Sequence, residues 1–122
     1  MIQVGSNDLC NAARSPQHTA EDLLSFAGNL VECRSMNRVI VCQILQCNSS
    51  EHVRGQNLGE YNAAVERTNA MLKACCTGNI IYWEHHHSVW GESKLGRDGI
   101  HLADHSIKGY ERSIRGQLYR QA

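Results

Sequence analysis

The chain has 122 residues, of which 42% are hydrophobic and 20% are charged, and its 12 lysine and arginine residues balance 12 aspartate and glutamate residues. This length and apolar content predict a single domain over residues 1–122 that buries one core. The balanced charge excludes strong attraction to nucleic acid or to an anionic membrane, so we expect neither as a partner. No apolar run is long enough to span a bilayer, and the sequence after Met1 lacks the features of a signal peptide, which favours a cytoplasmic protein.

The chain has six cysteines, an even number that would suggest disulfides in a small secreted protein. We expect free thiols instead, because no signal peptide is found and Cys42 and Cys75 lie in apolar patterns where cysteine acts as a small hydrophobe. No C-x-x-C pair occurs, and Cys42 with Cys47 has no second pair at the spacing of a zinc site. The sequence therefore predicts no structural metal.

The first expected elements are a strand over Ile2–Val4, which ends at Gly5, and a helix after it. Thr19 and Asp22 form a cap-like pair at the start of this helix, and Pro16 is expected in the loop before it. The apolar positions of the helix recur at helical spacing, at Leu23, Leu24, Ala27, Leu30 and Val31.

The middle of the chain predicts a strand, a helix and another strand. Val39–Leu45 is a nearly continuous apolar run rich in β-branched residues, and Ile80–Trp83 is a shorter one. The helix between them is expected to have Asn57 as its cap, with Glu60 three residues on, and to end near Gly78 in a left-handed turn. Its apolar stripe is expected at Tyr61, Ala64, Val65, Thr68, Met71, Leu72 and Cys75.

A last helix is expected after Asp104 as its cap, with an apolar stripe at Ile107, Tyr110, Ile114 and Leu118. This helix is also locally basic, because Lys108, Arg112, Arg115 and Arg120 stand against Glu111. Cations near a helix C-terminus complement the helix dipole. We therefore expect a solvated face here and not a contact with nucleic acid.

The alternation of strand and helix predicts an α/β fold with three layers, in which helices cover both faces of a parallel sheet. In each predicted strand, the side chains that point to either face of the sheet are apolar. This pattern also favours a sheet with helices on both faces. In open α/β sheets, ligands bind beyond the carboxyl ends of the strands. The loops after the three strands should therefore share one rim.

Two short motifs are expected at this rim. Gly5-Ser6-Asn7-Asp8 follows the first strand, and Asp98-Gly99-Ile100-His101 precedes the last helix. Acyl transfer needs a general base, a carboxylate that orients the base, and a donor to the developing oxyanion.

Residues of the two motifs match these three roles. His101 and Asp98 are three residues apart and can point the same way, as a base and its orienting acid require. Asn7 has a neutral amide that donates to an oxyanion without competing as a base, and Gly5 would let backbone approach the substrate. The motifs therefore predict ester hydrolysis with His101, Asp98, Asn7 and Gly5 at the site.

The first motif resembles the G-x-N-D block, and the second the D-x-x-H block, of the SGNH (GDSL-type) hydrolase family. The resemblance covers nearly the whole chain, and it implies a flavodoxin-like parallel sheet and a serine esterase that hydrolyses acyl or acetyl esters without a metal or other cofactor. It also implies that Asn7 belongs to the oxyanion hole, that Asp98 is the orienting acid, and that His101 is the general base acting on a small ester.

The chain departs from this family at its N-terminal side. It has no Gly-Asp-Ser block to supply the nucleophilic serine and no block with the second oxyanion-hole glycine. We therefore expect the N-terminal strands of the fold to be missing and the chain to be inactive alone. Ile2–Val4 would then be an exposed edge through which copies self-associate or aggregate.

Other nucleophiles and other classes of protein stay open. Ser6 and Cys10 lie near the first motif and are expected to be loop residues that do not replace the missing serine. One alternative class is a non-catalytic α/β fragment or mobile-element-derived protein that serves binding or assembly. A weaker one is a metal-dependent protein that uses His85-His86-His87, although a solvated or substrate-facing loop also explains these histidines. Three aromatic residues are candidates to line an acyl or aromatic pocket, namely Tyr82, Trp83 and Trp90, and core packing explains Tyr82 or Trp83 equally well.

Overall fold

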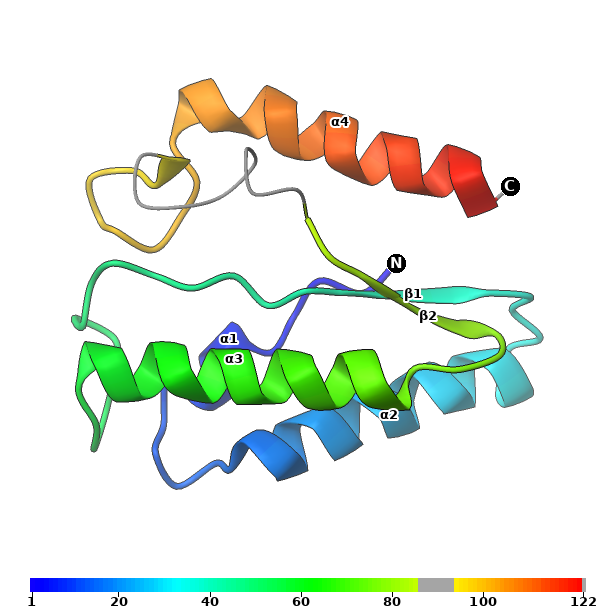
Figure 1. Cartoon of the computed structure of the whole chain (residues 1–122), viewed down its shortest axis with the longest axis horizontal. Coiled ribbons are helices and arrows are strands. Elements are labelled where there is room, and N and C mark those ends of the chain that lie inside the picture. Colours follow the sequence, from blue (N-terminus) through cyan, green and yellow to red (C-terminus); the bar gives the residue numbers. More distant parts are fainter. Residues whose placement is uncertain (86–93, 122) are drawn as a thin grey trace.

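The structure is a computed structural model, and it describes residues 1–85 and 94–121. Its elements in these ranges are α1 (Ser6–Leu9), α2 (Pro16–Cys33), β1 (Val39–Cys42), α3 (Leu58–Cys75), β2 (Ile80–Trp83) and α4 (Asp104–Gln121). Figure 1 shows α2 and α3 on one side of the strands and α4 on the other. Within the described ranges, no helix combines the length and apolar character needed to cross a bilayer.

The sheet is small. β1 and β2 pair in parallel, in a register that runs from Val39 opposite Ile80 to Cys42 opposite Trp83. The N-terminal segment adds a single parallel bridge, in which Ile2 N donates to the carbonyl of Ile40 (2.7 Å) and the carbonyl of Ile2 accepts from Cys42 N (2.9 Å). The prediction of a three-layer, flavodoxin-like sheet is therefore wrong, because the described residues form a two-stranded sheet.

The first predicted strand, Ile2–Val4, is reduced to the single bridge at Ile2, and the chain turns at Gly5 as predicted. This residue has φ +116°, a conformation that favours glycine, and a Cβ there would lie 2.8 Å from Ile44 Cδ1. The turn leads directly into the single-turn helix α1, where a loop was expected. Ile2 pairs with β1 and is buried, so within the predicted exposed edge Ile2–Val4 only Val4 is exposed.

The second predicted strand ends three residues early, at Cys42, because α3 supplies side-chain partners to the backbone that follows. Asn69 accepts from Ile44 N and donates to the carbonyl of Ile44, both at 2.8 Å. Asn62 makes the same pair of contacts with Cys47, at 3.1 and 2.9 Å. Asparagine side chains thus take the place of a neighbouring strand and satisfy these backbone groups.

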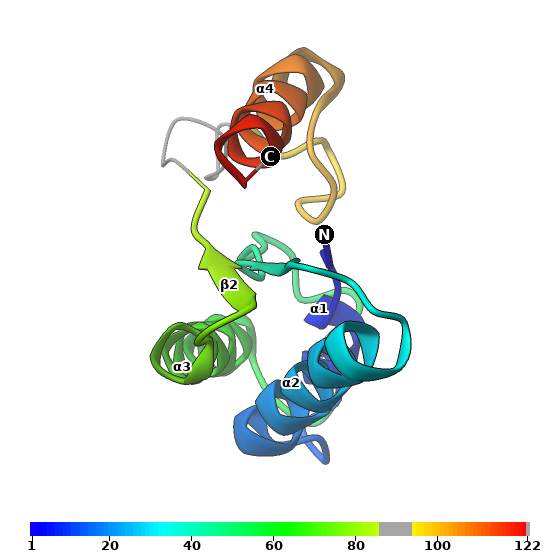
Figure 2. The same ribbon diagram turned by 90° about the vertical axis from the view of Figure 1, so that its right-hand side faces the viewer.

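The core lies between β1 and the helices α2 and α3, which pack side by side below the sheet in Figure 2. All four residues of β1 are buried. The core cluster consists of Ile2, Leu9, Ala20, Leu23, Ala27, Val39, Val41, Ile44, Tyr61, Ala64, Val65 and Leu72. Most of the predicted stripe of α3 is therefore in the core.

The ends of the helices follow their capping residues. The prediction for α3 is confirmed, because the Asn57 side chain accepts from Glu60 N at 2.8 Å. The prediction for α2 is wrong. Its cap is Ser15, which accepts from His18 N at 3.1 Å, and Pro16 is the first residue of the helix, where its missing N–H costs nothing. Thr19 therefore lies inside the helix and is buried.

The inward face of α4 matches the predicted one only in part, because Tyr110 and Ile114 of the predicted stripe are half-buried. Ile107 and Leu118 of the predicted stripe are 40% and 50% exposed, while Ser106 and Gln117 are buried. Asp104 is the first residue of the helix. The face that α4 turns inward is therefore largely polar.

The cysteines are free thiols, as predicted. Cys42 is buried in β1, which confirms its expected place among the apolar residues. Cys75 is exposed, so its assignment to the buried stripe of α3 is wrong. The following residue, Cys76, packs against the core instead.

Candidate active site

Asp98 and His101 form a hydrogen-bonded pair in the loop that leads into α4. His101 Nδ1 lies 2.6 Å from Asp98 Oδ2. The other carboxylate oxygen, Asp98 Oδ1, accepts from the backbone N–H groups of Ile100 and His101, both at 3.0 Å. The side chains of His101 and Asp98 are 81% and 44% exposed, so the pair fixes an orientation and adds little stability.

The contacts of Asp98 decide which nitrogen of His101 bears the proton. The hydrogen bond from His101 and the two backbone N–H groups lower the pKa of Asp98 to about 2, so the carboxylate is ionised at neutral pH. An ionised carboxylate only accepts hydrogen bonds. Neutral His101 therefore holds its proton on Nδ1, and the lone pair of Nε2 is available to take a proton.

The loop is anchored to the segment that follows β1. Asn48 N donates to the carbonyl of Gly99 at 2.6 Å. Gly99 is buried with φ +69°, and a Cβ there would lie 3.0 Å from the backbone of Asn48 and from Ser49 Cβ. Gly96 N also donates to the carbonyl of His101 at 2.8 Å. The position of His101 therefore depends on the close approach that Gly99 allows.

Residues of both sequence motifs line one cavity of about 200 Å³. Its wall includes Ser6 and Asn7 from α1, His101 from the loop before α4, and polar residues Ser49 and His52 from the segment after β1. Asn7 is exposed, so its amide is accessible to a bound molecule. The structure therefore brings Asn7 to the same cavity as His101, with Asp98 hydrogen-bonded to the imidazole.

Gly5 has a different place from the other three predicted residues. It is buried and is not among the residues that line this cavity. The side of Gly5 that would hold a Cβ faces Ile44 and Leu23. In the structure, Gly5 therefore allows the start of α1 to pack closely on the core. That the backbone of Gly5 approaches a substrate stays a prediction.

Two cysteines and a tyrosine that the sequence analysis did not assign to the site also line the cavity: Cys10, Cys47 and Tyr61. Burial raises the pKa of each, and a hydrogen bond links the side chains of Cys10 and Tyr61. Thiols with raised pKa values are mostly protonated at neutral pH and are weak nucleophiles. Among the described residues, the cavity thus has an oriented imidazole, and its two thiols are not activated.

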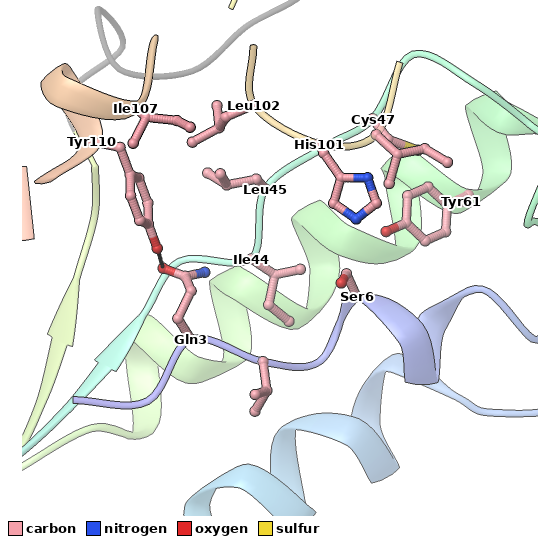
Figure 3. Close-up of a pocket in the computed structure, with 12 residues that line it drawn as sticks. Gln3, Ser6, Ile44, Leu45, Cys47, Tyr61, His101, Leu102, Ile107 and Tyr110 are labelled. Atoms are coloured by element: carbon pink, nitrogen blue, oxygen red, sulfur yellow. Dashed lines mark hydrogen bonds between the residues drawn. The ribbon is translucent and has the colours of Figure 1, made fainter. Parts of the chain in front are cut away.

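A longer groove of about 420 Å³ continues from this cavity toward α4 (Figure 3). The ring of His101 points toward Ser6 and Tyr61 at one end of it, and Gln3 and Tyr110 form the other end. Aliphatic side chains line most of the length between them: Val4, Ile44, Leu45, Ile100, Leu102 and Ile107. The apolar run Val39–Leu45 was the one sequence signal for this groove, since its last residues lie beyond the strand.

His85 belongs to a buried polar network and not to a solvated loop. Its Nε2 lies 2.8 Å from Gln3 Oε1, its Nδ1 lies 3.2 Å from Ser113 Oγ, and its backbone N–H donates to Gln43 Oε1 at 3.0 Å. Gln3 Oε1 only accepts, so the proton of neutral His85 is on Nε2. Burial lowers the pKa of His85.

His86 and His87, which belong to the weaker metal-dependent alternative, and also Trp90, lie outside the described residues. Within residues 1–85 and 94–121, no three His, Cys, Asp or Glu side chains are grouped so that they could hold a metal ion. Of the two other aromatic residues, Tyr82 packs against the core, and Trp83 is half-buried with the Arg120 guanidinium 5.7 Å from its ring centroid. Neither lines the His101 cavity.

Comparison with protein-family models, with curated proteins and with solved structures found no match to this chain. The resemblance to SGNH hydrolases therefore rests on the two motifs alone.

Proposed function

We propose that this chain contributes the base, the orienting acid and an oxyanion donor to the hydrolysis of acyl or acetyl esters. The observation that carries this proposal is the 2.6 Å contact between Asp98 and His101 at a cavity that Asn7 also lines. A general base needs a free lone pair, a fixed orientation and room for a reacting group. The Asp98 carboxylate supplies the first two for His101, and the cavity supplies the third.

The proposed reaction begins when an ester lies in the cavity with its carbonyl beside His101. Nε2 of His101 takes a proton from the attacking hydroxyl while the oxygen of that hydroxyl bonds to the carbonyl carbon. The carbonyl oxygen becomes negative and accepts a hydrogen bond from the amide of Asn7. The C–O bond then breaks, and the leaving alcohol takes the proton from the imidazolium.

The source of the attacking hydroxyl sets the expected rate. This chain has no Gly-Asp-Ser block, and its cavity thiols have raised pKa values. Because Ser6 is not expected to replace the serine of that block, the attacking group is water, and a positioned base contributes about 10²–10⁴-fold. We therefore expect slow turnover from this chain alone, well below that of a complete serine esterase.

The test is the rate of hydrolysis of 4-nitrophenyl butyrate by the purified chain. Replacing His101 with Ala should remove the excess over the buffer rate, and Asp98→Asn should do the same because an amide does not enforce the required tautomer. His18→Ala is the matched control, since His18 is an exposed histidine on α2. Equal rates for the wild type and His101→Ala, with matching circular dichroism spectra, would contradict the role of the base.

The second candidate function is non-catalytic binding or assembly. The absence of an activated nucleophile among the described cavity residues favours it. A folded chain with no turnover on any ester would support this function. Loss of turnover on addition of a chelator would point instead to the metal-dependent alternative. Self-association through the N-terminal edge stays a prediction for either function.

We also expect this protein to act in the cytoplasm. The six cysteines are free thiols, and Cys10 and Cys47 are both in the candidate site. Free thiols persist in reducing compartments.

A further inference from the structure

We propose that the groove between the N-terminal segment and α4 binds the linear acyl chain of a medium-chain ester, which makes the site selective for longer acyl groups over acetyl. This inference rests on the proposed function, because it assigns the reacting carbonyl to the end of the groove at His101. It adds the class of substrate, which the two motifs leave open.

The lining of the groove suits an alkyl chain. Its floor is Ile44, which is 2% exposed, and its walls include the half-buried side chains of Leu45 and Leu102. Val4 from the N-terminal segment and Ile107 from α4 also line the groove and are 56% and 40% exposed. Exposed aliphatic side chains gathered around one groove mark a binding surface, since each would lose water-exposed area when an apolar ligand fills the groove.

The groove is continuous with the cavity of the proposed base. Five residues line both, namely Ser6, Cys47, Tyr61, Ile100 and His101. An ester carbonyl placed beside His101 can therefore direct its acyl chain along Ile44 toward Ile107. The polar part of the cavity, at Asn7 and Ser49, is left for the oxyanion and the alcohol group.

The far end of the groove is polar and fixed, which limits the length of chain that fits. The Tyr110 hydroxyl donates to Gln3 Oε1 at 2.9 Å, as the dashed line in Figure 3 marks. Gln3 is held further by a 2.8 Å bond from its Nε2 to the carbonyl of Gln43. A longer chain would have to displace these bonded groups or leave the groove, so affinity should rise with chain length and then level off.

The test measures binding separately from turnover. Octanamide is a suitable probe, because its carbonyl stands in for that of the ester and the amide resists hydrolysis. We expect it to bind the chain at least about tenfold more tightly than acetamide, since each buried methylene is worth up to about fourfold in affinity and the groove is open on one side. Nitrogen-15 chemical-shift titration should report the largest changes at Val4, Leu102 and Ile107.

A pair of variants on one helix locates the bound chain. Ile107→Asn places an amide on the rim of the groove and should weaken octanamide binding by about tenfold. Leu118→Asn is the matched control, because Leu118 is similarly exposed, lies on the same face of α4 about 16 Å further along, and does not line the groove. Its affinity for octanamide should equal that of the wild type.

The outcomes separate this inference from the proposed function. Octanamide binding no tighter than acetamide binding, or an equal loss in both variants, would overturn the acyl groove. Tight, Ile107-dependent binding without His101-dependent hydrolysis would support the groove and contradict the base. Hydrolysis that depends on His101 but proceeds equally on acetyl and octanoyl esters would support the base and contradict the groove.

Discussion

The two sides of the small sheet are covered by different kinds of contact. On one side, α2 and α3 pack on Val39 and Val41 through a continuous apolar core. On the other side, the described contacts of α4 are mainly polar or aromatic, and include Tyr110 with Gln3 and Ser113 with His85. Figure 2 shows α4 apart from the strands, on the side opposite α2 and α3. Ile107 and Tyr110 of α4 line the groove that reaches His101, so the groove lies on this less tightly packed side.

We expect the side of the sheet that α2 and α3 cover to determine the free energy of unfolding of the whole chain. Leu72→Ala should have the largest effect, a loss of about 2–5 kcal/mol in the free energy of unfolding, because Leu72 is fully buried against the core. Leu118→Ala on the exposed face of α4 should stay within about 0.5 kcal/mol. Urea unfolding of both variants measures the difference, and similar losses would show that the two sides contribute equally.

A smaller loss is expected at the boundary between strand and loop. Asn69→Ala removes both bonds to the backbone of Ile44 and leaves its partly buried N–H and carbonyl unpaired, which should cost about 1–3 kcal/mol. Asn29→Ala, at an exposed position of α2, is the control and should be close to neutral. If Asn69→Ala is as stable as the control, the account of why β1 ends at Cys42 is wrong.

The polar side should show the smallest effect and a dependence on pH. The pKa of His85 is lower in the folded chain than its ordinary value near 6.5, so the unfolded chain binds the proton more readily. The contribution of neutral His85 to the free energy of unfolding is therefore complete above about pH 6.5. It is lost as the pH falls through the pKa that His85 has in the folded chain, which is lower. Protection of α4 amides in hydrogen exchange should decrease on acidification.

His85→Gln should reduce this pH dependence, because glutamine does not titrate. His18→Gln is the control, since His18 is exposed on α2 and makes no contact with α4 through this network. Equal pH dependence in the wild type and in His85→Gln would show that His85 does not link α4 to the sheet.

Local patterns in the sequence predicted the elements whose partners are near in the chain. The cap of α3 joins Asn57 to Glu60, and the apolar run at Ile80–Trp83 is a strand, because both depend on neighbouring residues. The hydrogen bond between Asp98 and His101 also follows from a separation of three residues. Their function in catalysis stays a prediction.

The parts that were not predicted depend on partners far along the chain. The end of β1 is set by Asn69, which is 25 residues away from Ile44. The periodicity of α4 predicts Tyr110 on the inward face, but its polar partner Gln3 is 107 residues away, so no local pattern indicates this bond. The groove likewise forms only when α4 lies beside the N-terminal segment, so the apolar run Val39–Leu45 indicates part of its lining and not the groove as a whole.

The most direct test of the account is the tautomer of His101, because the proposed base requires a free lone pair on Nε2. Nitrogen-15 NMR of the imidazole, at a pH where the ring is neutral, distinguishes the two nitrogens, and Asp98→Asn serves as the reference. We expect a proton on Nδ1 and none on Nε2 in the wild type, with this preference reduced in Asp98→Asn. A wild-type ring that bears its proton on Nε2 would contradict the account, whatever the chain hydrolyses.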